Sequence, residues 1–101
     1  MERQRRQRIL DNVSYEQAVV ELKDLLHILV SPLVEHQDEI EIVPVEMERQ
    51  LVLKLHVNNE DMGRVIGRAG KRAQAIRTLL KAKASRVGVR IAVDIVDEIE
   101  E

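Results

Sequence analysis

A chain of 101 residues, 45% of them apolar, is long enough for one domain with a single two-layer core. It contains no cysteine, Phe or Trp, which excludes disulfide frameworks, thiolate metal sites and sheets that stack bases on several aromatic rings. The net charge of −2 conceals a strong separation of basic from acidic stretches along the chain.

Residues 1–13 contain four arginines between Arg3 and Arg8 and show no sustained apolar period. Such a stretch is predicted to form a flexible basic extension that adds contacts to phosphate groups. Because the beginning of the chain lacks the long apolar run of a signal peptide, we expect a cytoplasmic protein. At the other end, residues 98–101 are predicted to form an acidic, solubilising tail, which leaves residues 14–97 as the folded domain.

A first helix is predicted to begin at Tyr15. Ser14 stands three residues before Gln17, the spacing of a capping box, and Val13 and Ala18 are placed as a hydrophobic staple. The apolar residues of its buried face follow the spacing of an amphipathic helix: Ala18, Val19, Leu22, Leu25, Leu26 and Leu29. Pro32 either kinks this helix or ends it with a last turn beyond the proline, and the sequence leaves both possibilities open.

Two strands are predicted next. Residues 39–47 alternate between polar and apolar side chains, and Pro44 places this strand at a sheet edge. Residues 48–50 predict a turn. Residues 51–57 alternate cleanly and predict a second strand. Its core face consists of Leu51, Leu53, Leu55 and Val57.

The second half of the chain predicts two helices and a final strand. Asn58 and Asn59 offer a cap for a short helix over about 60–66. A longer helix follows Gly70, and a last strand is predicted over 87–96. The core residues of this helix are predicted to be Ala73, Ile76, Leu79, Leu80 and Ala84, and those of the strand Val89, Ile91, Val93 and Ile95. This order, α-β-β-α-α-β, predicts an α+β domain with a three-stranded sheet backed by three helices.

Basic residues concentrate in the second half of the chain. Residues 9–61 hold three basic and twelve acidic residues, whereas residues 62–93 hold nine basic residues and no acidic ones. The nine are Arg64, Arg68, Lys71, Arg72, Arg77, Lys81, Lys83, Arg86 and Arg90. A solvated helix face explains most charge runs, but here no carboxylate is interspersed, which favours a polyanion partner.

Three of the four glycines lie between Gly63 and Gly70. A P-loop is excluded, because its first glycine would fall on Val65 and Arg72 stands where the magnesium-binding Ser or Thr belongs. A dinucleotide fingerprint is excluded as well, because the stretch joins two predicted helices and lacks Gly-x-Gly. What remains is a tight Gly-x-x-Gly turn at a helix N-terminus, where the peptide chain can approach a phosphodiester backbone.

The run Val65-Ile66-Gly67-Arg68-Ala69-Gly70 carries the Val-Ile-Gly-x-x-Gly signature of the KH domain. The predicted element order is similar to the bacterial, type II form of that fold, and residues 61–78 resemble the small single-domain RNA-binding proteins of the KhpA type. The resemblance implies non-catalytic binding of about four nucleotides of single-stranded RNA at the Gly-x-x-Gly cleft and an RNA chaperone-like role. It also implies pairing with a second copy or with a larger KH-containing protein of the KhpB/Jag type.

The residues predicted to bind RNA lie in and beside this turn: Arg64, Ile66, Gly67, Arg68, Ala69, Gly70, Lys71 and Arg72. Within this set the two glycines allow backbone approach, Arg68 and Lys71 neutralise phosphates, and the other two arginines give outer support. The alternative is a protein-interaction module, a homodimer or the small subunit of a complex, in which RNA contact is secondary.

No catalytic, metal or cofactor site is expected. The three histidines, His27, His36 and His56, share no spacing typical of a metal pair. The four glutamates within residues 39–48 fit the protection of an edge strand against aggregation, and nothing near them resembles a nucleophile and base.

Overall fold

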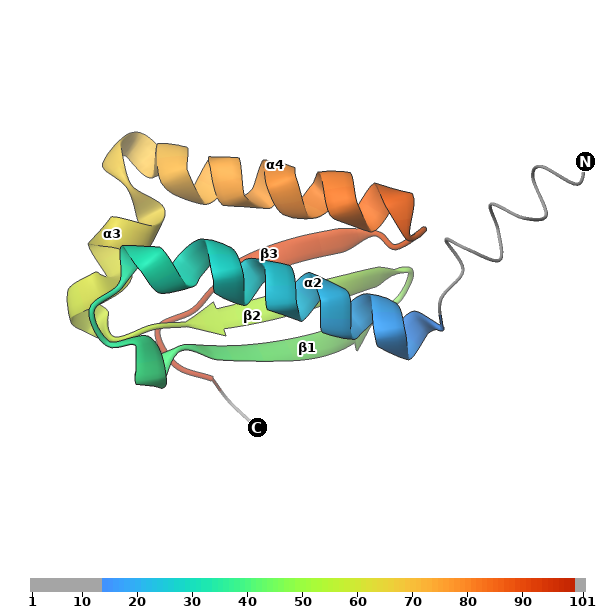
Figure 1. Ribbon diagram of the computed structural model, residues 1–101, viewed down its shortest axis with the longest axis horizontal. Coiled ribbons are helices and arrows are strands. Elements are labelled where there is room, and N and C mark those ends of the chain that lie inside the picture. The colour runs from blue at the N-terminus through green and yellow to red at the C-terminus, as the bar shows by residue number, and fades with distance from the viewer. Residues whose placement is uncertain (1–13, 100–101) are drawn as a thin grey trace, which may run out of the picture.

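The computed structural model describes residues 14–99, so the predicted basic extension, Val13 of the predicted staple and the last two residues lie outside the described part. Its main elements are α2 (Tyr15–Val30), β1 (Glu41–Met47), β2 (Gln50–His56), α3 (Met62–Ile66), α4 (Lys71–Arg86) and β3 (Ile91–Ile95), shown in Figure 1. The predicted α+β class and element order are therefore confirmed.

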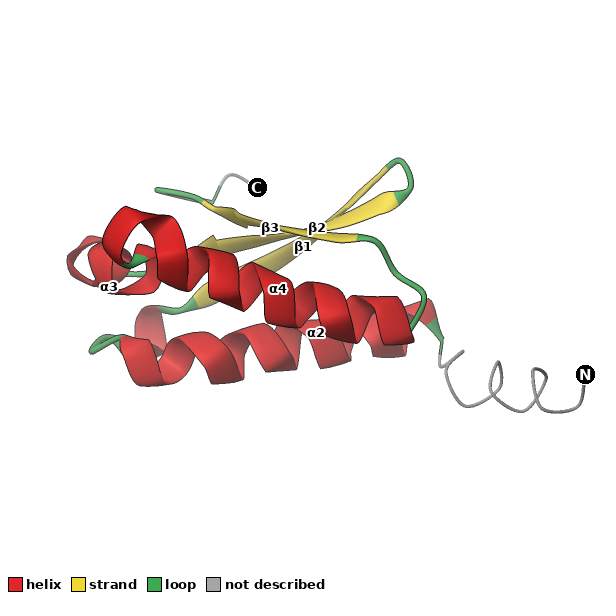
Figure 2. Ribbon diagram, turned by 90° about the horizontal axis from the view of Figure 1, so that it is seen from above, coloured by secondary structure: helices red, strands yellow, loops and turns green. Residues whose placement is uncertain are grey.

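The three strands form one sheet in the order β1-β2-β3. β1 pairs with β2 antiparallel, and β2 pairs with β3 parallel. A parallel pair needs a crossover, which α3 and α4 supply. Figure 2 shows α2 and α4 lying side by side on one face of the sheet. Pro44, opposite Leu53, lies on the edge strand β1, as the sequence predicts, and an edge strand is where a sheet tolerates proline.

The first helix begins where its cap predicts. The Gln17 backbone N–H donates to the Ser14 hydroxyl at 3.1 Å, while the Gln17 side chain donates to Glu21 instead of completing a capping box. At the other end α2 stops at Val30, and Pro32 lies in a 3₁₀ turn over Ser31–Leu33. Pro32 thus ends the helix without kinking it.

None of the helices within residues 14–99 combines the length and the apolar character that a membrane-spanning helix needs.

The core lies between the sheet and the two long helices. β2 runs over Gln50–His56 instead of residues 51–57 and supplies Leu51, Leu53 and Leu55 to the core. Val57 follows directly after the strand and is buried as well, so the predicted core face is confirmed. These four residues pack with residues of α2 and α4: Leu22, Leu26, Val30, Ile76, Leu80 and Ala84. The sequence predicts Leu79 in this core, but the Leu79 side chain is 51% exposed and lies outside it. The buried stripe of α4 runs through positions 73, 76, 80 and 84, and residue 79 lies beside that stripe.

Both outer strands are shorter than predicted. The last strand begins at Ile91 instead of residue 87, because residues 87–89 hydrogen-bond to the end of α4. Val87 and Val89 donate backbone N–H groups to the Ala84 carbonyl, and Gly88 adopts a φ of +73° between them. β1 begins at Glu41 instead of residue 39, because Gln37–Glu39 forms a 3₁₀ turn.

Candidate nucleic-acid interface

The turn between α3 and α4 is built from residues with positive φ. Gly67, Ala69 and Gly70 have φ values of +75°, +56° and +74°. The Gly70 N–H donates to the Gly67 carbonyl at 3.1 Å and closes the turn. Three such residues out of four reverse the chain within one short loop. The result is the corner at the end of the molecule seen in Figure 1, with α4 beginning at Lys71.

The two glycines of the turn are required for different reasons. A Cβ on Gly67 would lie 2.6 Å from the Arg72 Cβ, and its ψ of 174° puts the residue in a region that is essentially restricted to glycine. A Cβ on Gly70 would meet nothing within 4 Å. Gly67 therefore allows the loop to pack against α4, whereas Gly70 leaves an open surface at the start of that helix.

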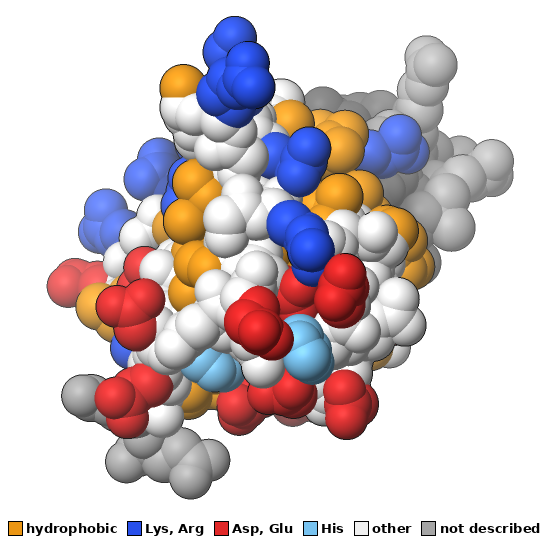
Figure 3. All heavy atoms as spheres, turned by 90° about the vertical axis from the view of Figure 1, so that its left-hand side faces the viewer, with side chains coloured by type: hydrophobic (Ala, Val, Ile, Leu, Met, Phe, Trp, Pro, Cys, Tyr) orange, Lys and Arg blue, Asp and Glu red, His pale blue; other side chains and the backbone are white. Residues whose placement is uncertain are grey.

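Arg68 and Lys71 carry uncompensated positive charge at this corner. Both are exposed, and neither forms an ion pair with any residue in the range 14–99. They flank the N-terminus of α4, where free N–H groups and the helix dipole add further positive potential. Figure 3, which looks onto this end of the molecule, shows Lys and Arg side chains gathered over its upper part.

Two other arginines of the predicted site are engaged within the protein. The Arg72 guanidinium donates to the backbone carbonyl of Arg64, near the end of α3. The Arg64 guanidinium pairs with Asp61 at 2.8 Å and with Glu35 at 3.2 Å. These contacts link the first turn of α4 to α3, and α3 to the segment that follows α2.

Asp61 is a residue of this region that the sequence analysis missed. It is fully buried and accepts backbone N–H groups from Glu35 at 3.1 Å and His36 at 3.0 Å, besides the Arg64 guanidinium. Burial alone would raise the pKa of the Asp61 carboxyl, but the hydrogen bonds and nearby positive groups hold it below its ordinary value. The i, i+3 spacing of Asp61 and Arg64 was the available signal for this pair.

The lower part of the same end of the molecule is acidic. The His36 ring lies 2.9 Å from a Glu60 oxygen and 3.3 Å from a Glu39 oxygen. The hydrogen bond to Glu60 raises the pKa of the His36 imidazole above its ordinary value, against an opposing effect of burial. Figure 3 shows carboxylates and histidines grouped there, below the basic corner. A polyanion approaching this end is therefore directed to the corner between α3 and α4.

The two aliphatic residues before the turn have opposite environments. Val65 is fully buried and anchors α3 in the core, whereas Ile66 is exposed beside the turn. Ile66 therefore offers an apolar surface next to the uncompensated cations. Among the described residues, no group of three His, Asp or Glu side chains is arranged to hold a metal ion.

The sequence that forms the sheet, the long helix α4 and this corner matches a known protein family. The family described as "KhpA/KhpB, KH domain" matches residues 23–95, which span the sheet, α3, the turn and α4. The chain belongs to this family.

Curated relatives in the KhpA/KhpB family cover about three quarters of the chain. The RNA-binding protein KhpA of Listeria monocytogenes serovar 1/2a is 42% identical over 76 residues, which are 75% of this chain and 100% of the relative. KhpA of Leifsonia xyli subsp. xyli is 46% identical over 74 residues, 73% of this chain and 93% of the relative. KhpA of Borreliella burgdorferi is 39% identical over 74 residues, 73% of this chain and 90% of the relative.

Proposed function

We propose that this protein is a non-catalytic, single-stranded RNA-binding protein that clamps about four nucleotides at the turn between α3 and α4 and has an RNA chaperone-like role. The observation that carries the proposal is that Arg68 and Lys71 are exposed and form no ion pair within residues 14–99, beside the open face of Gly70. The KhpA relatives, which carry RNA-binding in their names, support it. A cytoplasmic location fits a bacterial-type protein with an RNA partner.

Each predicted site residue has a proposed role. The RNA backbone passes over Gly70 and the exposed Ala69, where Arg68 and Lys71 neutralise its phosphates. Ile66 forms an apolar wall for a base or ribose. Gly67 keeps the turn closed against α4, and the engaged arginines, Arg64 and Arg72, hold the corner in shape while adding positive potential at longer range.

The double variant Arg68→Asp/Ala69→Asp tests this proposal. It replaces a phosphate-binding cation by two carboxylates at exposed positions, so binding of an RNA of about four nucleotides should be lost. Asp tolerates the left-handed backbone of residue 69, so the thermal unfolding midpoint should change little.

The matched control is Ala82→Asp/Arg86→Asp, which makes the same change of charge on exposed positions at the far end of α4. This control should retain binding of the short RNA. Unchanged RNA affinity in the turn variant, measured by fluorescence anisotropy, would contradict the proposal.

A second candidate function is that of a protein-interaction module. The observation that favours it is a set of apolar side chains exposed on the helices: Val20 and Ile28 on α2, and Leu79 on α4, with Ile28 65% exposed. A homodimer, or a complex with a larger KH-containing protein of the KhpB/Jag type, would cover them. Light scattering over a range of protein concentrations, with and without RNA, separates the two functions. A concentration-independent monomer that binds RNA tightly would count against this second one.

A further inference from the structure

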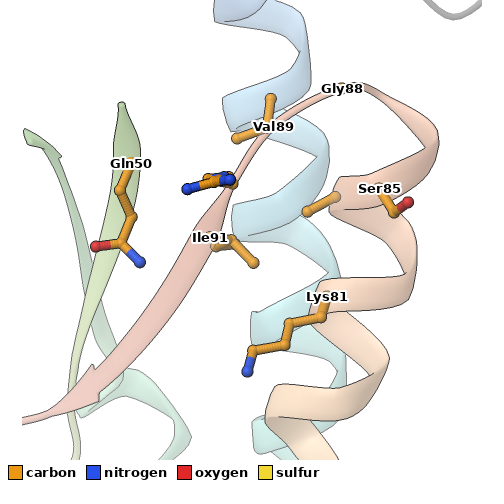
Figure 4. A pocket seen from close by; sticks show the side chains of 8 residues that line it. Gln50, Lys81, Ser85, Gly88, Val89 and Ile91 are labelled. Carbon is orange, nitrogen blue, oxygen red and sulfur yellow. The ribbon is translucent and has the colours of Figure 1, made fainter. Parts of the chain in front are cut away.

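Two adjoining hollows lie at the end of the molecule opposite the α3–α4 turn. The first, about 420 Å³, lies between the C-terminal half of α4 and the start of β3, with Lys81, Ser85 and Arg90 among its lining (Figure 4). The second, about 240 Å³, extends to Tyr15 and to Arg49 at the tip of the β1–β2 hairpin. Both are lined by Gln50, Gly88, Val89 and Arg90, so they form one continuous surface, called here the Arg90 hollow.

The Arg90 hollow combines cations with apolar surface. Three cations, Lys81, Arg90 and Arg49, lie along it, and Figure 4 shows the Lys81 side chain extending from α4 toward the strands. Apolar side chains line the space between them: Ala84, Val89, Ile91 and Leu51. Paired cations beside an apolar surface fit a phosphate and its attached nucleoside.

Tyr15, the one aromatic residue of the chain, contributes to the same hollow and is 42% exposed. Glu46 is the one carboxylate that lines either hollow within the described residues. Burial and the neighbouring Glu46 raise the pKa of the Tyr15 phenol, so the ring stays neutral. A neutral, half-exposed ring next to cations is a platform on which a base can stack.

Helix α4 connects the turn to the Arg90 hollow. Arg77 lies four residues before Lys81 and therefore on the same face of the helix. The Arg77 guanidinium donates to the Val93 carbonyl at 3.2 Å, so this face looks toward β3, an edge strand of the sheet. Lys71, at the turn, and Lys81, at the hollow, are separated by about 15 Å of helix at its usual rise of about 1.5 Å per residue. A few nucleotides of extended RNA cover that distance.

From this geometry we propose that the Arg90 hollow is a second nucleotide-binding site, occupied by the same single-stranded RNA after it leaves the turn and follows the border of α4 and β3. Lys81, Arg90 and Arg49 contact phosphates, and Tyr15 stacks on a base. This inference rests on the proposed RNA binding at the turn. It extends the contact with RNA beyond the four-nucleotide clamp.

The test compares two RNAs, oligouridylates of about four and roughly ten nucleotides, on the full chain. The variant Lys81→Gln/Arg90→Gln should bind the longer RNA roughly ten- to thirtyfold more weakly at moderate salt. The slope of log affinity against log salt should become shallower by about 1.4, or about 0.7 for each lost contact to a single strand. Binding of the short RNA should not change.

Arg86→Gln is the matched control, since Arg86 is an exposed cation on the same helix and lines neither hollow. It should leave the salt slope for the longer RNA close to that of the unmodified chain. Tyr15→Leu should weaken the longer RNA roughly five- to tenfold without changing the salt slope, and Tyr15→Phe should restore the affinity because it keeps the ring.

Each result separates this site from the turn. Suppose that the Arg68→Asp/Ala69→Asp variant no longer binds the short RNA, while the Lys81→Gln/Arg90→Gln variant binds the longer RNA with unchanged affinity. This result overturns the second site and leaves the proposed site at the turn intact. If the unmodified chain binds neither RNA, the proposed function itself fails. If the Lys81→Gln/Arg90→Gln variant changes the sedimentation of the protein and not its RNA affinity, the hollow is a protein contact and the inference is overturned.

Discussion

Single residues at the corner between α3 and α4 divide into those that shape it and those that remain available to a ligand. Gly67 and Asp61 belong to the first group. Gly67 lies so close to Arg72 in the first turn of α4 that it has no room for a Cβ, and the buried Asp61 carboxylate accepts two backbone N–H groups. Gly70 and Lys71 belong to the second, because they face open space. Substitutions in the two groups should therefore affect different measurements.

Gly67→Ala should destabilise the protein by about 3 kcal/mol, since it combines a glycine-only backbone conformation with a collision against Arg72. Gly70→Ala should cost only about 1 kcal/mol, because its left-handed backbone is strained but no atom is in the way. Urea denaturation gives both free energies of unfolding. Equal costs at the two positions would contradict the different roles assigned to the glycines.

Asp61→Asn should lower the thermal unfolding midpoint by more than about 5 °C, because the buried acceptor for two N–H groups and Arg64 loses its charge. The pKa of Asp61 is lowered by folding, so the carboxylate stabilises the fold above the unfolded pKa of about 3.9, and this contribution disappears as the pH falls.

The difference in midpoint between Asp61→Asn and the unmodified protein should therefore be constant above about pH 5 and narrow as the pH falls below the unfolded pKa of about 3.9. Asp24→Asn, at an exposed carboxylate on α2, is the control and should follow the unmodified protein throughout. A difference that does not depend on pH would show that the charge of Asp61 is not what stabilises the corner.

At the scale of elements, the segment between α2 and β1 is held to α3 by side chains. His36 bonds to Asp61 through its backbone N–H and to Glu60 through its ring. Such contacts place the 3₁₀ turns around Pro32 and Asp38 against the start of α3. The position of the α3–α4 corner therefore depends on a segment some thirty residues earlier in the chain.

The His36 contacts predict a pH dependence of stability. Folding raises the pKa of His36, so the protonated ring stabilises the protein below its ordinary pKa of about 6.5, and this contribution is lost as the pH rises through the higher folded value. The unmodified protein should thus be more stable than His36→Gln at about pH 5.5 and lose that advantage by about pH 8.

Chemical denaturation at several pH values measures this advantage of His36. His27→Gln, at a histidine exposed on α2, serves as the control and should show no comparable trend. If the stability advantage of the unmodified protein over His36→Gln instead grew with rising pH, the pairing of His36 with Glu60 and Glu39 would be contradicted.

The elements themselves were largely predictable. Local signals, such as the Ser14 cap and the alternation of residues 51–57, match the structure because cap and strand periodicity are properties of neighbouring residues. The predictions that were wrong concern residues whose environment depends on packing against segments distant in the sequence. Leu79 is exposed because the packing of α4 on the sheet selects a narrower stripe, and β3 starts late because the end of α4 holds residues 87–89.

For the whole molecule, positive charge is distributed over two ends. The α3–α4 turn carries Arg68 and Lys71, and the Arg90 hollow lies at the C-terminal end of α4 and reaches Tyr15. Figure 1 shows that α2 begins at this same end of the molecule. Four further arginines precede Ser14 in the sequence. RNA affinity should therefore depend on salt more steeply than one four-nucleotide contact explains.

Removal of residues 1–13 should leave the free energy of unfolding nearly unchanged, because their sequence shows no sustained apolar period that would form a buried face. If the four arginines contact phosphates, the salt slope for a long RNA should become shallower by up to about 2.8, at about 0.7 for each contact. A version with these arginines changed to glutamine separates charge from chain length. An unchanged slope in both would show that the basic extension takes no part in binding.

The family signature, the α+β order, the core face of residues 51–57 and the position of the glycine turn could all be read from the sequence, because each depends on residue type and local spacing. The use of each arginine, in contrast, depends on contacts between distant segments of the folded chain. In the sequence, Arg64 and Arg72 cannot be distinguished from Arg68 by charge. In the structure, Arg64 pairs with Asp61 and Glu35, and Arg72 donates to the carbonyl of Arg64. The tertiary structure also brought Tyr15, Arg49 and Arg90 together from three distant segments, a juxtaposition that no local pattern encodes.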